Sequence, residues 1–298
     1  MNDRPRRPAT PPGVVVVDKP AGWTSHDVVA RMRRLAGTRK VGHAGTLDPM
    51  ATGVLVVGVD RATRLLGHLA LAEKAYDATI RLGESTVTDD AEGEVTARAD
   101  ASAVPEEEVV AAVRALTGSI EQVPSAVSAV KVDGRRSYAR VRQGEPVELA
   151  ARAVEVSVFD VLDVRRGSGV VDVDAHVVCS SGTYVRALAR DLGAAVGVGG
   201  HLTRLRRTRV GGFDLAQAHT LEALERDVTV VPLAEVARAG FPTFAASGEQ
   251  AARVRHGRAL PETDLGAEGP VAVMAPEGEF LALYEQRGAD AKAVAVFA

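Results

Sequence analysis

An unbroken apolar run from Val54 to Val59 constrains the fold most, because it follows directly on a polar, glycine-rich loop. A run of this length is typical of a strand that is buried on both faces. In the preceding loop, Asp48 stands before a proline and is therefore biased away from helical backbone angles. Functional side chains are often placed on such loops above a rigid strand. The alternative is that Asp48 only caps a turn, because Asp-Pro is a common turn dipeptide.

The composition is that of an ordinary globular protein. The chain has 298 residues, 46% of them hydrophobic and 25% charged, which suits one large domain with or without a small second one. The single cysteine, Cys179, excludes an internal disulfide and argues against a cysteine-based zinc site; we expect a buried, inert thiol. The first residues lack the apolar segment of a signal peptide, and no apolar run reaches transmembrane length. We therefore expect a cytoplasmic protein without membrane contact.

Apolar periodicity predicts mixed strands and helices followed by a small β-rich module. Strands are predicted at 14–17, 54–59, 76–82, 154–164, 170–178 and 201–210, and helices at 24–36, 105–116, 184–195 and 220–226. Asp60 is the expected N-cap of a helix with Leu65, Leu66 and Leu69 on its apolar side. The acidic stretch 83–94 lacks the ligand spacing of a calcium loop and is interpreted as a solvated hairpin. Residues 1–13 are predicted to be a disordered, basic tail, and short alternating runs after Gly240 predict the terminal module.

The charges are distributed unevenly. The formal net charge is −3, yet the segments 31–40, 131–142 and 204–209 hold 14 of the 36 basic residues and one acid, Asp133. Such clusters on an acidic body favour a surface that tracks nucleic-acid phosphates. The alternative is three separately solvated faces.

Arg186 stands in the first turn of the predicted helix 184–195, where the helix dipole favours acids over bases. A positive group beside free N–H donors suggests a bound carboxylate or phosphate. A solvent-exposed arginine explains the position equally well, so the residues alone leave both interpretations open.

Several common chemistries lack their motifs. There is no phosphate-binding Gly-Lys-Ser/Thr loop, dinucleotide fingerprint or Gly-x-Ser-x-Gly elbow, and the seven histidines are scattered without the spacing of metal ligands. The search points away from metal, nucleotide and redox chemistry. It leaves one carboxylate, a tyrosine, arginines and basic segments.

These remaining residues lie in segments that resemble a known family. Gly42–Pro49, with Ala51–Leu55 after it, is similar to the catalytic motif of the TruB family, the tRNA pseudouridine-55 synthases. The segments 17–22, 74–76, 181–186 and 200–207 resemble further motifs of the family, in the family's order. The resemblance covers roughly residues 14–235, and the last 60 or so residues are only loosely similar to the RNA-binding PUA module.

The resemblance implies an α+β fold with a central, mostly antiparallel mixed sheet flanked by helices. It implies a catalytic domain at 14–238, with a basic arm at about 124–152, and a PUA-like module at 239–298. It also implies a reaction without cofactor or metal, because the synthase isomerises a uridine. The partner would be the T-arm of tRNA. We expect a monomer without an obligate protein partner.

The resemblance also assigns roles to residues of this sequence. Asp48 would be the catalytic carboxylate, Arg186 would pair with it, and Tyr76 would stack on the uracil and serve in proton transfer. The remaining implied substrate or RNA contacts are His43 in the space vacated by the flipped base, Leu205 and Tyr184 near the base, Lys19 in support of the site, and Lys131, Arg135, Arg136, Arg140 and Arg204 on the tRNA backbone. One departure is Val127, where the family often has an aromatic residue.

Two other functions compete with this prediction. An RNA chaperone that binds tRNA without catalysis would explain the basic segments equally well. A glycosidase or nucleosidase would explain the carboxylate, but such enzymes usually use two carboxylates, and no partner acid stands out in the sequence.

Overall fold

The computed structural model describes residues 10–125, 131–132, 135–136 and 149–298, with the backbone alone at 131–132 and 135–136. Its largest sheet runs in the order β14-β1-β3-β12-β4-β11-β10-β7, with β2 on β3 and β13 on β12. These strands are β1 (Gly13–Lys19), β2 (Val41–His43), β3 (Thr52–Val59), β4 (Lys74–Leu82), β7 (Gly118–Gln122), β10 (Arg152–Arg166), β11 (Val171–Cys179), β12 (Gly200–Val210), β13 (Phe213–Asp214) and β14 (Val231–Pro232). Among the described strands of this sheet, β3 and β12 are the one pair that runs in parallel. The mostly antiparallel mixed sheet is thus confirmed.

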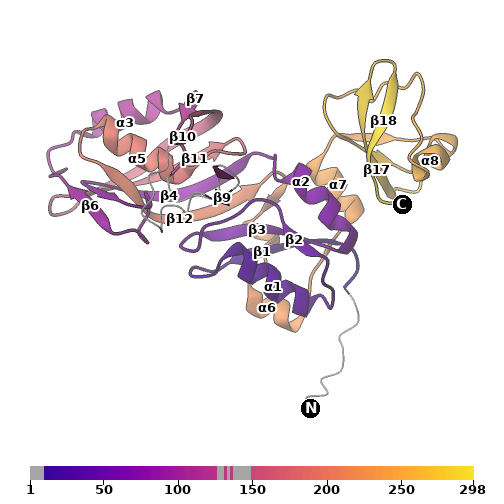
Figure 1. The fold of residues 1–298 in the computed structure, drawn as a ribbon, viewed down its shortest axis with the longest axis horizontal. Helices are drawn as coiled ribbons and strands as arrows, with labels where there is room; N and C mark the ends of the chain where they lie inside the picture. The colour runs from indigo at the N-terminus through magenta and orange to yellow at the C-terminus, as the bar shows by residue number, and fades with distance from the viewer. Residues whose placement is uncertain (1–9, 126–130, 133–134, 137–148) are drawn as a thin grey trace, which may run out of the picture.

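Helices cover both faces of this sheet (Figure 1). They are α1 (Ser25–Leu35), α2 (Leu66–Leu69), α3 (Glu106–Ala115), α5 (Val185–Ala195), α6 (Leu221–Arg226) and α7 (Leu233–Gly240), with 3-10 turns η1 (Asp60–Leu65) and η2 (Leu215–Gln217). Alternate residues of β1 enter different cores. Val15 and Val17 pack in the core that includes α1, α5 and α6, whereas Val14 and Val16 pack in the one that includes α2 and α7. Strand β3 is likewise buried on both faces, which explains its continuous apolar run.

The close approach of β3 and β12 depends on Gly53. Its φ is +100°, and a Cβ at this position would lie 2.2 Å from the carbonyl oxygen of Arg207. We expect Gly53→Ala to lower the free energy of unfolding by at least about 2 kcal/mol, because backbone atoms on both strands would have to move. Gly67 in α2 is the control, since a Cβ there meets nothing within 4 Å. Urea unfolding should show little loss, or a gain, for Gly67→Ala; equal losses in the two variants would contradict the argument.

The C-terminal residues form the predicted β-rich module. Its sheet has the order β15-β16-β17-β18, and one helix packs beside it. The elements are β15 (Thr243–Ala245), α8 (Gly248–Arg255), β16 (Val271–Met274), β17 (Phe280–Arg287) and β18 (Asp290–Val296). The module lies at one end of the molecule, beside α2 and α7 (Figure 1). Phe280 and Phe297 join the same core as Val14 and Val16, and Arg61 donates a hydrogen bond to the carbonyl of Phe297 at 2.7 Å. The module is therefore attached to the larger sheet through a shared core.

Three local expectations were wrong at the ends of elements. Asp60 is not an N-cap: it begins η1 with a φ of +52°, and no side chain caps that turn. Part of the expected disordered tail is structured, because Thr10 donates a backbone hydrogen bond to the carbonyl of Ala36 and β1 starts at Gly13. Helix α5 begins at Val185, and Tyr184 is its N-cap residue.

The acidic stretch does form a hairpin, between β5 (Glu84–Thr86) and β6 (Val95–Arg98). It is not fully solvated as expected, because Asp90 in its connection is only 2% exposed. Thr88 donates a hydrogen bond to the Asp90 carboxylate, as does the backbone N–H of Glu92. The burial of Asp90 becomes important at the site.

Within the predicted basic arm, the structure describes the backbone pairing of β8 (Lys131–Val132) with β9 (Arg135–Arg136). Arg140 and Val127 lie outside the described residues. None of the helices in the described ranges combines the length and the apolar character that a membrane span requires.

Candidate active site

The loop that carries Asp48 connects β2 to β3 and is held by a buried serine of α1. Ser25 accepts a hydrogen bond from the backbone N–H of Leu47 at 2.8 Å and donates one to its carbonyl at 3.0 Å. Both polar groups of Leu47 are thus satisfied away from solvent. The residue immediately before Asp48 is fixed by this pair of bonds.

Arg207 supports the loop from the opposite side. It is almost completely buried, and its guanidinium donates to three carbonyl oxygens: Val54 at 2.7 Å, Thr46 at 3.1 Å and Gly45 at 3.2 Å. These bonds connect β12 to the start of β3 and to the Asp48 loop. A buried cation that donates to several carbonyls stabilises the segments that carry them, and its removal would leave those carbonyls unpaired.

This finding corrects the interpretation of the basic segment 204–209 as a continuous phosphate-binding surface. Arg207 is buried, Arg206 forms an ion pair with Asp18, and Arg209 forms one with Glu73. Arg204 is the exposed member of the segment. Its contact with tRNA stays a prediction.

Lys19 connects the end of β1 to the residue after Asp48. Its ammonium is fully buried and donates to the carbonyls of Pro20 at 2.9 Å, Trp23 at 2.6 Å and Pro49 at 3.2 Å. Burial lowers the pKa of Lys19 to about 8, and the nearby Asp48 carboxylate opposes this shift. The role of Lys19 in support of the site stays a prediction.

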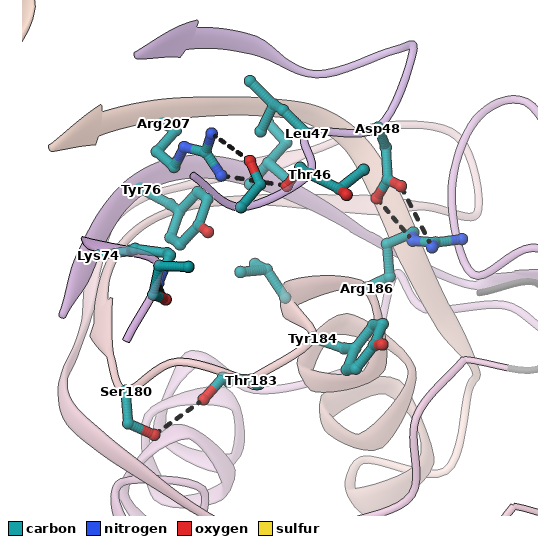
Figure 2. A pocket seen from close by; sticks show the side chains of 15 residues that line it. Thr46, Leu47, Asp48, Lys74, Tyr76, Ser180, Thr183, Tyr184, Arg186 and Arg207 are labelled. Carbon is teal, nitrogen blue, oxygen red and sulfur yellow. Dashed lines mark hydrogen bonds and ion pairs between the residues drawn. The ribbon is translucent and has the colours of Figure 1, made fainter. Parts of the chain in front are cut away.

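Arg186 lies between two carboxylates. Its Nε is 3.1 Å from Oδ2 of Asp48, and its Nη1 is 3.4 Å from Oδ2 of Asp90 (Figure 2 draws the Asp48 pair). Nη1 also donates to the carbonyl of Thr88 at 3.0 Å. Arg186 is 6% exposed, whereas the Asp48 side chain is 35% exposed. The predicted anion beside Arg186 is thus provided by the protein, and Asp48 presents its remaining surface to the solvent side.

Asp90 is a member of this cluster that the sequence prediction missed. The stretch around it is rich in acids and turn residues, which made a solvated loop the natural interpretation. No local pattern signals that Asp90 is buried, because its partner Arg186 is 96 positions away and belongs to α5. With Asp90 in place, Arg186 is held from the side opposite to Asp48.

A cavity of about 270 Å³ opens beside this ion pair. Five of the predicted site residues line it: Asp48, Tyr76, Tyr184, Arg186 and Leu205. Tyr76 and Lys74 of β4 lie on one side of the cavity, and Asp48 and Arg186 lie on the other (Figure 2). Burial raises the pKa of Tyr76, so its hydroxyl is protonated at neutral pH. A flat apolar group could lie between these walls with one edge facing the carboxylate.

Tyr184 reaches the cavity because Gln122 fixes its backbone. The Gln122 side chain donates to the carbonyl of Tyr184 at 3.1 Å and accepts from its N–H at 2.8 Å. Gln122 is buried at the end of β7, and sequence reasoning assigned it no role. The backbone N–H and carbonyl of Tyr184 are both satisfied by this pair of bonds. The start of α5 and the adjacent Arg186 are therefore fixed relative to β7.

His43 is not among the described residues that line the cavity, and the basic side chains of the arm lie outside what the structure describes. His43 lies at the end of β2 with its ring edge-on to that of His26, at 5.7 Å between centroids. Burial lowers the pKa of His43, which favours the neutral ring at neutral pH. No cluster of three or more potential metal-ligating side chains occurs among the described residues.

Lys74 offers a test of the electrostatics of the cavity. Burial, with a smaller contribution from Arg207, lowers its pKa to about 8 from 10.5. The folded protein then loses this proton near pH 8 and the unfolded chain loses it only near pH 10.5, so stability from this group should rise with pH between these values. Urea unfolding at intervals from pH 7.5 to pH 9.5 should show the native chain gaining stability relative to Lys74→Met. Lys292→Met, which removes an exposed lysine and keeps Lys74, is the control: its stability should change with pH as that of the native chain does. Parallel curves for all three proteins would refute the argument.

Solved structures with the same architecture include chains of H/ACA ribonucleoprotein complexes. The chain aligns over 96% of its length with 86% of a chain in the "Crystal structure of the archaeal box H/ACA sRNP Nop10-Cbf5 complex", with a TM-score of 0.72 and 28% identity. A chain in the "Structure of H/ACA RNP bound to a substrate RNA containing 2'-deoxyuridine" gives a TM-score of 0.71 at 26% identity, with 96% of this chain and 85% of that chain covered.

Sequence relatives and family models identify the chain more specifically than the solved structures do. The protein is 62% identical to the tRNA pseudouridine synthase B of Thermobifida fusca, with 96% of this chain and 98% of the relative covered. It is 59% identical to that of Streptomyces griseus, with 97% and 98% covered. Residues 33–185 match the TruB family pseudouridylate synthase N-terminal domain, residues 186–232 match the tRNA pseudouridylate synthase B C-terminal domain, and residues 241–298 match the C-terminal region of tRNA pseudouridine synthase II. The chain belongs to the TruB family of pseudouridine synthases and is an isomerase.

Proposed function

We propose that this protein converts a specific uridine in the T-loop of tRNA into pseudouridine, with Asp48 as the catalytic carboxylate. The observation that carries the proposal is the cavity in which the Asp48–Arg186 pair faces Tyr76 and Leu205. The relatives named tRNA pseudouridine synthase B support the choice of tRNA as substrate.

The proposed reaction rearranges one nucleotide. The bond between uracil N1 and C1′ of the ribose breaks, the base turns, and a bond forms between C1′ and C5 of the uracil. C5 then loses its hydrogen as a proton, and N1 takes up one proton. All atoms balance without a cofactor, metal or water. Asp48 acts as a carboxylate, and the guanidinium of Arg186 pairs with it and orients it. Tyr76 stacks on the uracil and takes part in the proton transfer at C5.

A base inside an RNA stack cannot enter a cavity of this kind. The target uridine therefore leaves its stack, at a cost of a few kcal/mol, and lies against Leu205 and Tyr76. His43 fills the space that the base vacates, and Tyr184 contacts the nucleotide. Lys131, Arg135, Arg136, Arg140 and Arg204 contact the backbone of the T-arm. We also propose that the chain works in the cytoplasm as a monomer without an obligate protein partner.

The test uses unmodified tRNA that carries tritium at C5 of its uridines. Isomerisation must release that tritium into water, whereas binding alone cannot. We expect release of one equivalent per tRNA, from the T-loop uridine. Tight tRNA binding without release would favour an RNA chaperone, and formation of free uracil would favour a nucleosidase; either result would overturn the proposal.

A further inference from the structure

The only tryptophan of the chain lies on the surface beside the Asp48 loop. Trp23 is 36% exposed and belongs to none of the hydrophobic cores formed by the described residues. Within the same ranges it makes no aromatic ring contact and its indole N–H makes no hydrogen bond. Burying this side chain would contribute more to stability than burying almost any other, so its exposure needs an explanation.

The position of Trp23 is fixed by bonds to the residues on both sides of Asp48. On one side, Gly22 donates its N–H to the carbonyl of Pro49 at 2.8 Å. On the other, Ser25 makes its two hydrogen bonds to Leu47. Trp23 and Asp48 are thus the central residues of two segments that are bonded together at both flanks. The backbone of Trp23 is held as well, because its carbonyl accepts from the buried ammonium of Lys19.

We propose that the indole of Trp23 is a stacking platform for a nucleobase of the substrate RNA other than the target uridine. The inference rests on the proposed function. Trp23 does not line the cavity that would receive the target uridine, so the base it contacts lies outside that cavity. A rigid aromatic ring binds an unstacked base without a preference for its sequence, because every base has a π-face.

An exposed acidic residue close to Trp23 in the chain favours a base over a phosphate at this surface. Asp27 lies in the first turn of α1, where Thr24 donates to its carboxylate from both its backbone N–H and its hydroxyl. These bonds lower the pKa of Asp27, which is therefore ionised and repels phosphate. An exposed aromatic ring that is close in sequence to a negative charge suits the uncharged face of a nucleobase.

The single tryptophan makes the test direct, because emission excited at wavelengths that tyrosine does not absorb reports Trp23 alone. We expect saturation with unmodified tRNA to change the emission and to reduce quenching by acrylamide severalfold. We expect Trp23→Ala to weaken tRNA affinity about tenfold with kcat nearly unchanged, since one stacked base contributes about that much. Trp23→Phe should recover most of the affinity. The matched control is Leu162→Ala, which removes a side chain that is 63% exposed on β10 and should leave the affinity unchanged.

The outcomes separate this inference from the proposed function. If the native chain binds tRNA and releases tritium, but neither emission nor acrylamide quenching changes, the Trp23 contact is wrong and the synthase function stands. Equal tRNA affinities of the native chain and Trp23→Ala would also overturn the contact. If tRNA protects Trp23 and Trp23→Ala weakens binding while no tritium is released, the contact stands and the proposed function fails.

Discussion

Asp48→Asn should abolish tritium release from tRNA while leaving tRNA affinity within about twofold of the native value. The amide has the shape of the carboxylate but lacks the charge that pairs with Arg186 at 3.1 Å. Losing a group that acts directly on the reacting atoms typically lowers kcat by a factor of about 1,000 or more. Affinity should be kept, because the proposed contacts with the tRNA backbone lie elsewhere. Single-turnover release and filter binding on the same protein samples would measure the two quantities separately.

The control for this prediction is Asp160→Asn, the same chemical change at an exposed position on β10. It should retain native turnover and affinity. Turnover by Asp48→Asn at the native rate would remove the carboxylate from the reaction, and the Asp48–Arg186 pair would then be only structural. A parallel loss of affinity would instead indicate that the substitution disturbs the loop that Ser25, Lys19 and Arg207 hold.

Helices and strands could be predicted from local sequence patterns wherever the burial of side chains follows one pattern along the whole element. Val54–Val59 is continuously apolar because β3 is buried on both faces, and Tyr76–Leu82 alternates because it is a strand. Asp48 stands out because a glycine-rich loop and a proline surround it. The end of an element is harder to predict, as Asp60 shows, because the backbone angles there depend on the packing of the next turn.

The predictions failed where long-range partners decide the burial of a charge. Arg207 lies in a basic run, yet three carbonyls from the Asp48 loop and β3 bury it. Asp90 lies in an acidic run, yet Arg186 buries it. The partners of Arg207 and of Asp90 are both far away in the sequence. Periodicity and composition therefore could not reveal that these two charged side chains are buried. The meeting of Asp48, Tyr76 and Arg186 in one cavity likewise depends on the sheet order, and only the resemblance to a family indicated it.

Arg186→Met should both destabilise the protein and stop the reaction. The substitution leaves Asp90 buried without its cation, and breaking a buried ion pair in this way costs about 3–5 kcal/mol. It also removes the charge that orients Asp48, so kcat should fall at least about a hundredfold. Urea unfolding and tritium release measure the two effects. The control is Arg165→Met, which breaks an exposed pair with Asp174 and should cost less than about 1 kcal/mol with native turnover.

The double variant Arg186→Met/Asp90→Leu separates these two effects. Removing both buried charges eliminates the unpaired carboxylate, so most of the lost stability should return, because apolar replacements of a buried pair are often neutral or stabilising. Activity should not return, since Asp48 still lacks its cation. A stable but inactive double variant would assign Arg186 a role in the reaction that is independent of folding. Recovery of stability and turnover together would mean that Arg186 only balances the charge of Asp90, and that Asp48 reacts without its help.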